Sequence, residues 1–596
     1  MKTDTDAPVP SGTVRKISIV DEVPSFTVVL SPCYQARHCT SCSYTNLNIT
    51  GVFLSAQKRA PLRFHNPDYL SSISFSQASV QPKEAPLMRK RFPTASAMSS
   101  INVLTATASQ LQELLQSGTV TSEGIAKEYL HHIEKHNNRL RALIEVAPED
   151  HVLSIARELD EERKSGKIRG PLHGIPIVVK DNIATHPDLG LKTTGGSFAF
   201  TDLVPSETAS SVRRLTDAGC LVVGKANLTE FANFKGSEMP CGWSARGGQT
   251  QSPYVQGGWD PTEKFGGHSG PGGSSSGSAV AVAAGFAPIS IGTETWGSLI
   301  MPASRANVFT LKPSRGVIPM DGVMPVSDIY DISGPMAKSA SDIANTLDAL
   351  ADPGAPRRPQ TGYISMVTKS WTGLRLGAVD TADWRLDEML AEPDDDWFQQ
   401  QGNDIANAYS KLHDLGVDIK YPVPFADRGI TTNTLAEVIE HNFVRGFDHF
   451  LSQMKSSSVT SVVELVEFNK QHADREMPPE APNQDVLLAA LNAEPWSESQ
   501  TLDKVREGEK YAGDDSVSRC LDDQNIDILL GPADSWLTDF ACVAGYPSAS
   551  LPLSFWNKNG RAFGVIALTR KHREDLLIQL MSAWESVFPC INPPKL

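Results

Sequence analysis

Apolar residues first recur at helical spacing after about residue 108, where they mark two amphipathic faces separated by a short break. The first face is formed by Leu111, Leu114 and Leu115, and the second by Ile125, Tyr129, Leu130 and Ile133. Gly118 and Thr121 lie between the two faces, where a glycine ends one helix and a threonine caps the next. The pattern therefore predicts two helices joined by a turn at residues 118–121.

Short, uninterrupted apolar runs follow, which is typical of strands that are buried on both faces of a sheet. One run spans residues 175–179 and ends at Lys180, and a second lies in GCLVVGKAN at residues 219–227. The stretch SAVAVAAGFAPISIG at residues 278–292 predicts a helix of small residues followed by a third strand. This alternation predicts an α/β fold, with a large mixed or parallel central sheet covered by helices on both faces.

The second half of the chain changes character twice. Residues 354–525 are mostly charged and helical in pattern, with proline-rich breaks, and we expect them to form a helical cap over the sheet. Strand patterns return in DILLGP and GYPSASLPLSF, and a last helix has an apolar stripe formed by Leu576, Leu577, Leu580 and Trp584. Residues 526–596 are therefore expected to rejoin the α/β core that residues 99–353 begin.

Residues 1–98 differ from the rest of the chain in composition. They show no sustained helical or strand period, and residues 1–100 hold 11 Lys and Arg against 6 Asp and Glu in a chain of net charge −15. We expect a poorly ordered N-terminal extension here. A targeting segment, or a true start of translation at Met98, are the alternatives that the pattern leaves open.

The overall composition excludes several classes of function. A net charge of −15 does not suit binding to nucleic acid or to an anionic membrane, because both require clustered Lys and Arg. No run approaches the ~18 apolar residues of a membrane-spanning helix, and the first 30 residues lack a secretory apolar segment. We expect a cytoplasmic protein that is a monomer or a homodimer.

Cysteine usage points to a reduced compartment. Eight cysteines in 596 residues are too few for a disulfide scaffold. Cys39 and Cys42 have C-x-x-C spacing beside His38, but no second pair follows at the distance of a zinc site. A metal or redox role for this motif is less favoured than the absence of such a role, and no metal site is predicted.

Three stretches place a polar, reactive group where a packed core favours an apolar one, and the first is Lys180. A lysine at the end of a strand usually keeps its ammonium group in water. If the side chain is buried instead, desolvation lowers its pKa, and the neutral amine can act as a base. The pattern alone leaves both interpretations open.

The second stretch is GPGGSSSGSAVAVAAG at residues 270–285, which runs directly into the small-residue helix. Its backbone N–H groups and hydroxyls are gathered at a helix N-terminus, an arrangement that suits an anion or oxyanion. It lacks the G-K-[ST] ending of a phosphate-binding loop. An oxyanion site and a tight structural turn remain as alternatives.

The third stretch is GTETWGS at residues 292–298, in which Ser298 follows a predicted strand. A turn that leaves a strand can expose a nucleophile, but the motif is not the G-x-S-x-G elbow of α/β-hydrolases. No acidic residue and histidine are spaced to complete a Ser-His-Asp triad. His173 is expected to be structural.

In this order, the three stretches resemble the amidase signature family. The resemblance runs from about residue 101 to 353, includes LKPSRGVIP, and resumes in the C-terminal 70 residues. GWSARGGQTQSPYV, GTET-x-GS and FNKQHADREMP are similar to the branch that contains bacterial peptide amidases and fungal amidases. The resemblance implies the amidase-signature fold and hydrolysis of a carboxamide C–N bond, with no cofactor.

By the same resemblance, the catalytic triad falls on Lys180, Ser274 and Ser298. Ser298 would be the acylated nucleophile, Ser274 a bridging serine on a cis peptide bond, and Lys180 the neutral base. The N–H groups that stabilise the oxyanion would belong to Thr295, Trp296, Gly297 and Ser298. Gln249 and Ser275 are further candidates for contact with the substrate.

The chain departs from the family at Trp296, where relatives usually carry Gly or Asp. An oxyanion donor needs only its N–H group, so the indole can change without removing catalysis. We expect the ring to narrow the acyl pocket or to stack on a flat group of the substrate. Packing of the ring into the core, or a distorted and weakly active site, are the alternatives.

A second departure is a glycine-rich insertion at residues 255–271, which contains Trp259, Phe265 and His268. A mobile flap at the entrance of the site and a surface loop without a role are both open. Ser276 and Met301, which replace a usual Gly and Cys, are expected to matter little.

Three functions remain after these considerations. An amidase that cleaves linear amides through an acyl-enzyme on Ser298 is the first. An acyltransferase or esterase that uses the same acyl-enzyme is the second, and a ligand-binding relative without catalysis is the third.

Overall fold

A computed structural model describes residues 101–263, 265–386, 392–426, 429–589 and 592–596. These residues belong to one compact unit that spans residues 91–596. The expectations for residues 1–98, which include the Cys39, Cys42 and His38 motif, lie outside the described residues.

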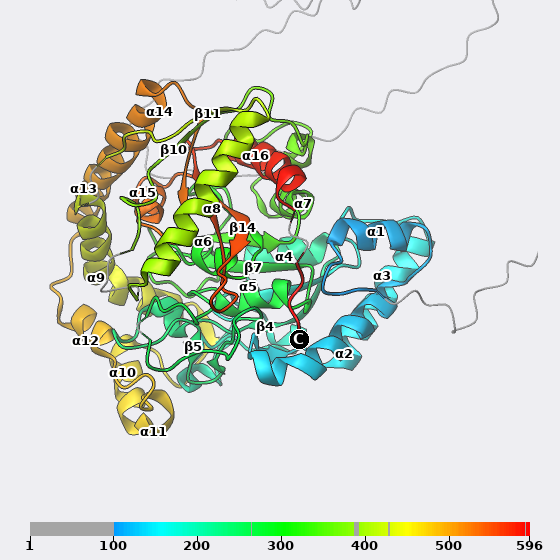
Figure 1. Cartoon of the computed structure of the whole chain (residues 1–596). Helices are drawn as coiled ribbons and strands as arrows, with labels where there is room; N and C mark the ends of the chain where they lie inside the picture. Colours follow the sequence, from blue (N-terminus) through cyan, green and yellow to red (C-terminus); the bar gives the residue numbers. More distant parts are fainter. Residues whose placement is uncertain (1–100, 264, 387–391, 427–428, 590–591) are drawn as a thin grey trace, which may run out of the picture. The chain divides into compact units, whose positions relative to one another are not determined.

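The core is one sheet of 11 strands (Figure 1). Across the sheet, the strands are β1 (Leu143–Val146), β4 (Leu221–Ala226), β2 (Pro176–Lys180), β7 (Ile289–Glu294), β9 (Ile332–Ala337), β8 (Phe309–Lys312), β14 (Ser548–Phe555), β15 (Ala562–Leu568), β13 (Ile528–Pro532), β10 (Arg375–Ala378) and β11 (Asp418–Lys420). The pairs β4–β2, β2–β7, β13–β10 and β10–β11 are parallel, and the others are antiparallel. The sheet is therefore mixed, and the predicted strands β2, β4, β7, β13 and β14 are confirmed.

Helices cover both faces of the sheet, because its strands are apolar on both sides. In β15, Val565 and Ala567 pack in the apolar cluster of α7 (Ala340–Leu350) and α16 (Glu574–Val587). The alternate residues Ile566 and Leu568 pack in the cluster of α6 (Ile300–Arg305) and α15 (Leu537–Val543). Successive side chains of a strand point to opposite faces, so these two clusters lie on opposite sides of the sheet.

The N-terminal helices follow their predicted pattern. They are α1 (Ala108–Gln116), α2 (Ser122–Leu140) and α3 (Glu149–Lys164). The Thr121 hydroxyl accepts a hydrogen bond from the Gly124 amide at 3.0 Å and caps α2. Gly118, at φ +69°, makes the turn after α1 in the left-handed region that suits glycine.

The remaining short elements connect the sheet to its surroundings. The helices are α4 (Ser210–Asp217) and α5 (Ser276–Ala283), with single turns η1 (Pro187–Leu189), η2 (Phe198–Phe200), η3 (Glu230–Asn233) and η4 (Tyr363–Met366). Two small antiparallel pairs join β3 (Val204–Pro205) to β12 (Met454–Ser456), and β5 (Trp243–Ser244) to β6 (Gly248–Gln249).

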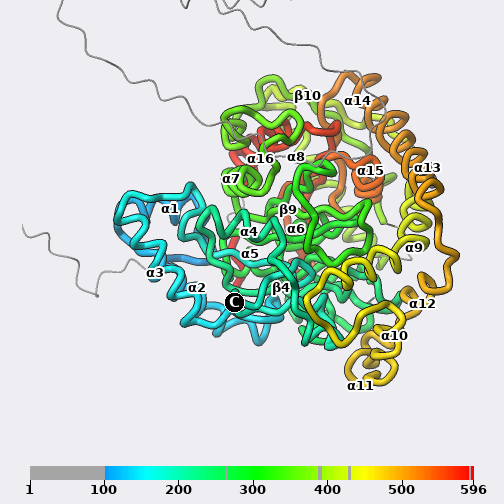
Figure 2. Tube along the Cα trace, turned by 180° about the vertical axis from the view of Figure 1, so that it is seen from behind, coloured from blue at the N-terminus to red at the C-terminus, as the bar shows by residue number. Residues whose placement is uncertain are grey.

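Residues 354–525, predicted as one helical cap, divide into two parts. Residues up to 420 contribute β10 and β11 to the central sheet, and α8 (Asp395–Asp414) packs on β14 and β15. The helical layer begins only after them, with α9 (Gly429–Ser452), α10 (Val462–Gln471), α11 (Ala473–Glu476), α12 (Asp485–Asn492), α13 (Glu498–Glu509), a π-helix (Lys510–Ser518) and α14 (Arg519–Asp523). Figure 2 shows α9 to α14 together along one side of this unit.

Membrane insertion through a helix finds no support in the described ranges. None of their helices is both long and apolar enough to cross a bilayer.

Candidate active site

Lys180, the last residue of β2, is fully buried. Its Nζ lies 2.8 Å from Ser274 Oγ, 2.9 Å from Thr293 Oγ1 and 3.2 Å from the Thr293 carbonyl oxygen. Thr293 lies on the neighbouring parallel strand β7, so the sheet itself brings these groups together. The alternative of a solvated strand-end lysine is therefore wrong, because the amine is held inside the protein.

The pKa of Lys180 is lowered to about 7, because burial disfavours the charged ammonium. The negative charges of Asp331 and Glu294 act in the opposite direction and limit the effect. Near neutral pH, a substantial fraction of the amine is therefore unprotonated and able to accept a proton.

Ser274 lies in the tight turn that leads into α5, and the Gly273–Ser274 peptide bond is cis, as the resemblance implies. The Ser276 hydroxyl donates a hydrogen bond to the Gly272 carbonyl and closes this turn. Small residues are required here: a Cβ at Gly277 would lie 2.2 Å from the carbonyl oxygen of Ala142. The glycine and serine stretch is thus a packed turn rather than a flexible linker.

Ser275 has a positioning role in the structure. Its hydroxyl donates to the Thr293 carbonyl at 2.9 Å, and its amide donates to the Ser298 carbonyl at 3.2 Å. One residue therefore ties the Ser274 turn both to β7 and to the turn that carries Ser298. The Ser275 side chain is not among the groups that line the cavity described below.

Ser298 lies in the turn between β7 and α6, and its side chain is almost completely buried. Gly297 adopts φ +67° in this turn, a conformation that other residues rarely adopt. The buried Glu294 carboxylate accepts hydrogen bonds from the amides of Leu299 at 2.8 Å and Ile300 at 3.2 Å. Glu294, which the sequence did not single out, thus fixes the start of α6 immediately after Ser298.

Asp331 is a second residue of the site that sequence reasoning missed. Its carboxylate accepts hydrogen bonds from Thr295 Oγ1 at 2.5 Å and from the amides of Val326 at 2.8 Å and Ser327 at 3.1 Å. Burial raises the pKa of Asp331 to about 6. The aspartate therefore orients Thr295 and also sets part of the field at Lys180.

The side chains of Ser274, Thr295 and Ser298 line one cavity of about 310 Å³. The lining is mainly apolar, and helix α9 contributes Leu435, Ala436 and Ile439 to it. Met301, expected to matter little, also lines this cavity. Two serines of the predicted triad, Ser274 and Ser298, therefore line the same cavity, and helix α9 of the helical layer forms part of its wall.

Trp296 is half-buried and lines the same cavity. Its ring stacks on that of Trp536, with centroids 5.6 Å apart and planes inclined by 20°. The indole therefore packs against the protein on one side and borders the cavity as well. The expected contact of the ring with the acyl group of a substrate stays a prediction.

Residues Ala232, Asn233 and Phe234 form another part of the cavity wall. The backbone of this turn is unusual, because Phe231, Ala232 and Asn233 have φ values of +48°, +52° and +80°. Residues other than glycine rarely adopt this conformation, and it persists only where the surroundings enforce it.

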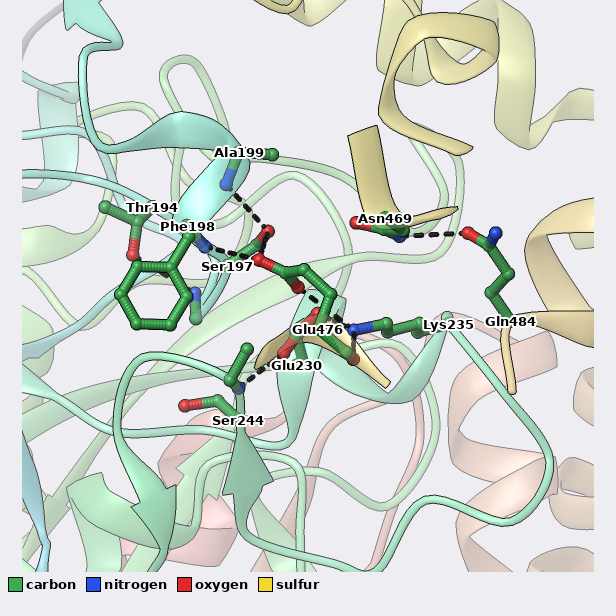
Figure 3. Close-up of polar contacts among 12 residues, drawn as sticks. Thr194, Ser197, Phe198, Ala199, Glu230, Lys235, Ser244, Asn469, Glu476 and Gln484 are labelled. Carbon is green, nitrogen blue, oxygen red and sulfur yellow. Dashed lines mark hydrogen bonds and ion pairs between the residues drawn. The ribbon is translucent and has the colours of Figure 1, made fainter. Parts of the chain in front are cut away.

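A buried ion cluster joins the residues that flank this turn, Glu230 and Lys235, to Glu476, and Figure 3 shows these three side chains pointing toward one another. Lys235 Nζ lies 2.5 Å from Glu230 Oε1 and 3.2 Å from Glu476 Oε2, and all three side chains are fully buried. Glu476, at the end of α11, also accepts hydrogen bonds from the Ser197 hydroxyl and the Phe198 amide. The cluster therefore ties the cavity wall to the helical layer from both ends of the turn.

The insertion at residues 255–271 is anchored in its second half. Phe265 lines the cavity, and the Arg305 guanidinium donates to the carbonyls of Gly267 at 2.6 Å and Gly270 at 3.2 Å. The buried His268 ring contacts the rings of Trp397 and Trp556, with centroids 5.4 Å and 4.8 Å away. Phe265 is thus part of the cavity wall, and the contacts of Gly267, His268 and Gly270 attach the adjoining segment to the rest of the protein. A mobile flap at the entrance stays a prediction.

Gln249, a predicted substrate contact, and His173, expected to be structural, both lie outside the lining of this cavity. Gln249, on β6, donates to the carbonyls of Cys241 at 2.8 Å and Thr250 at 3.0 Å, and it does not line the cavity. His173 is buried beside α3, where its Nε2 lies 2.9 Å from the Leu159 carbonyl oxygen, in keeping with a structural role.

Comparison with known proteins agrees with this geometry. Residues 125–578 match the family model described as Amidase. A Schizosaccharomyces pombe protein named "Putative amidase C869.01" is 31% identical over 535 residues, which cover 83% of this chain and 87% of that protein. An Arabidopsis thaliana protein named "Probable amidase At4g34880" is 29% identical, with coverage of 83% and 93%.

Solved structures give the same result. The native peptide amidase from Stenotrophomonas maltophilia superposes with a TM-score of 0.73 at 31% identity, and the match covers 82% of this chain and 98% of that protein. An amidase family protein from Bacillus anthracis gives a TM-score of 0.73 at 27% identity, with coverage of 83% and 93%. With its family match, its relatives and its mixed sheet all in agreement, the chain belongs to the amidase family.

Proposed function

We propose that the protein hydrolyses a carboxamide through an acyl-enzyme on Ser298, with Ser274 and Lys180 as the proton relay. The observation that carries this proposal is the 2.8 Å contact between Lys180 Nζ and Ser274 Oγ, beside a cavity that Ser274 and Ser298 share. A serine hydroxyl is a poor nucleophile unless a positioned base accepts its proton. The lowered pKa of Lys180 supplies that base near neutral pH.

In the first half-reaction, Ser298 Oγ attacks the carbonyl carbon while its proton passes to Ser274 Oγ and the Ser274 proton passes to Lys180 Nζ. The C–N bond then breaks, and the relay returns a proton to the departing amine. In the second half-reaction, water attacks the acyl carbon and the relay accepts its proton. The bond between the acyl carbon and Ser298 Oγ then breaks, the relay returns the proton to Ser298 Oγ, and the carboxylic acid is released.

The oxyanion of each tetrahedral intermediate needs fixed N–H donors, and removing one such donor typically costs about 10²- to 10³-fold in rate. We assign this role to the backbone from Thr295 to Ser298. Support comes from the position of this turn at the cavity and from the hydrogen bonds that hold it, through Asp331 on one side and Glu294 on the other.

The substrate is a linear amide of a small molecule in this proposal. The likeness to a protein named as a peptide amidase supports a carboxamide whose acyl group is larger than acetyl. The cavity volume of about 310 Å³ is consistent with such a group.

A fluorophosphonate probe tests the nucleophile directly. We expect covalent labelling of the folded protein at one serine, lost in Ser298→Ala and retained in Ser554→Ala, a serine of β14 that does not line the cavity. Mass spectrometry of the labelled peptide identifies the site. Absence of labelling in the folded wild type, or labelling that persists in Ser298→Ala, would overturn the assignment.

The pH dependence tests the base. Because Lys180 must be unprotonated and its pKa is about 7, we expect kcat/KM to fall below pH 7, by about tenfold per unit, and to level off above it. Asp331→Asn removes a negative charge that raises the pKa of Lys180, so the falling limb should move to lower pH.

Asp503→Asn, at an exposed position of α13, is the matched control and should leave the profile unchanged. A profile that is flat between pH 5 and 8 in the wild type would argue against Lys180 as the base.

A further inference from the structure

We propose that the cavity selects amides with an uncharged aromatic acyl group, and that the stacked indoles of Trp296 and Trp536 are its specificity-determining residues. This inference rests on the proposed function, because it assigns the group that the acyl-enzyme carries. It concerns the chemistry of that group, which the proton relay does not determine.

The first argument is the chemical character of the cavity wall. Trp296, Trp536, Phe234, Phe265, Leu435 and Ile439 give it a broad apolar surface. Asp539 is the one ionisable side chain among the described residues that line it, and no Lys, Arg or His is present in that lining. An anionic acyl group would therefore lose its hydration without gaining a positive partner from this lining.

The second argument is size. A cavity of 150 Å³ lined by apolar side chains accommodates a benzene molecule. The cavity here has a volume of about 310 Å³, roughly twice as large. A two-ring group, or one ring on a short alkyl chain, therefore fits the space better than a single methyl or a long flexible peptide.

The third argument is the position of the indole pair relative to the reacting atoms. Trp296 is two residues before Ser298 and shares its turn, so the ring begins close to the carbonyl carbon that Ser298 would attack. Its near-parallel stacking on Trp536, inclined by 20°, holds two indoles together in the wall of the same cavity. Flat rings stack favourably on such a surface in an offset or edge-on arrangement.

The acyl side is the part of the substrate that this surface binds. In the proposed reaction, the acyl group remains bonded to Ser298 through both half-reactions, whereas the amine leaves and water takes its place. A mainly apolar cavity lined by the nucleophile suits the group that stays. The leaving group instead needs a route for exchange with water.

A series of primary amides tests the proposal, because ammonia is the common leaving group. The probes are acetamide, hexanamide, 4-phenylbutanamide, 3-(2-naphthyl)propanamide and succinamate. Since a single methylene in an apolar pocket changes kcat/KM by about 10- to 200-fold, we expect the naphthyl amide to exceed acetamide by at least 100-fold. Succinamate should not exceed acetamide.

Variants assign the effect to the indoles. Trp296→Leu and Trp536→Leu should each reduce the preference for the naphthyl amide over hexanamide by about tenfold or more. Trp371→Leu, which removes an indole outside the cavity, is the matched control and should leave the ranking unchanged. Calorimetry on Ser298→Ala gives a second readout, because binding of the naphthyl amide should be tighter than that of hexanamide without turnover.

Several results would overturn the inference. They are equal kcat/KM across the neutral amides, a preference for succinamate, or a ranking that Trp296→Leu and Trp536→Leu leave unchanged. Failure of the proposed function is distinguishable, since it appears as absent fluorophosphonate labelling and absent hydrolysis of every amide. In that case, the calorimetric ranking on Ser298→Ala still decides whether the cavity prefers aromatic groups.

Discussion

Replacing Lys180 by methionine is expected to lower kcat by at least about 10⁴-fold, because members of a catalytic relay act as a unit and the loss of one removes most of the rate. Methionine keeps an unbranched apolar stem in the buried site but has no amine to accept the Ser274 proton. The hydroxyl of Ser274 would then lose the partner that lies 2.8 Å away. Single-turnover kinetics on the folded variant measures the effect.

Lys225→Met is the matched control for this experiment. Lys225 is also fully buried, lies on the adjacent strand β4, and donates to the Ile183 carbonyl at 2.5 Å instead of to the site. Its loss should lower stability while the folded fraction keeps its kcat. If Lys180→Met retained near-normal turnover, or if both variants lost activity equally in their folded fractions, the relay would be wrong.

Replacing Lys235 by methionine is expected to lower the free energy of unfolding by about 3–5 kcal/mol, the usual cost of removing one partner from a buried ion pair. The variant would leave the carboxyl groups of Glu230 and Glu476 buried without their cation. Burial already raises the pKa of Glu230 to about 8, so this carboxyl resists ionisation even in the wild type. Urea unfolding, compared between wild type and variant, measures the loss.

The same variant should show a characteristic pH dependence. Lys235 lowers the pKa of Glu230, so without it the folded-state pKa of this carboxyl rises further above its unfolded value. Stability is therefore retained at low pH and lost as the pH rises through the folded pKa. Adding Glu476→Gln to Lys235→Met removes one of the two buried carboxyl groups, which itself raises the pKa of Glu230, and should restore part of the loss.

Lys127→Met breaks an exposed ion pair with Glu123 and serves as the control, with an expected change below about 1 kcal/mol. A loss for Lys235→Met as small as that of Lys127→Met would show that the cluster does not hold the cavity wall.

Much of the fold follows from local pattern. The strands β2, β4 and β7 are short apolar runs because both of their faces are covered, and this burial is visible in the sequence as an absence of alternation. The strands β10 and β11 do not have that signal. β11 spans only Asp418–Lys420 at the edge of the sheet, with two of its three residues exposed, so nothing distinguishes it from the charged helices around it.

The residues of the site also differ in whether the sequence alone could reveal them. Lys180, Ser274 and Ser298 lie at strand ends and turns, where a reactive side chain stands out from its neighbours. Trp536 and Ile439 reach the cavity from elements far away in the sequence, and their apolar character is equally typical of core packing. The role of Asp331 could not be predicted for another reason. Nothing in the sequence around this aspartate indicates that its carboxylate binds the Thr295 hydroxyl.

The order of strands in the sheet also constrains when the protein can become active during its synthesis. The strands β14, β15 and β13, made last, lie between β8 and β10, both of which leave the ribosome much earlier. The residues of the proposed relay are all translated by residue 298, yet Trp536 and the strands that unite the two halves of the sheet arrive more than 200 residues later. A growing chain therefore carries these three residues for about half of its translation without a finished pocket, and the cavity wall is complete only once the segment that contains Trp536 has been added.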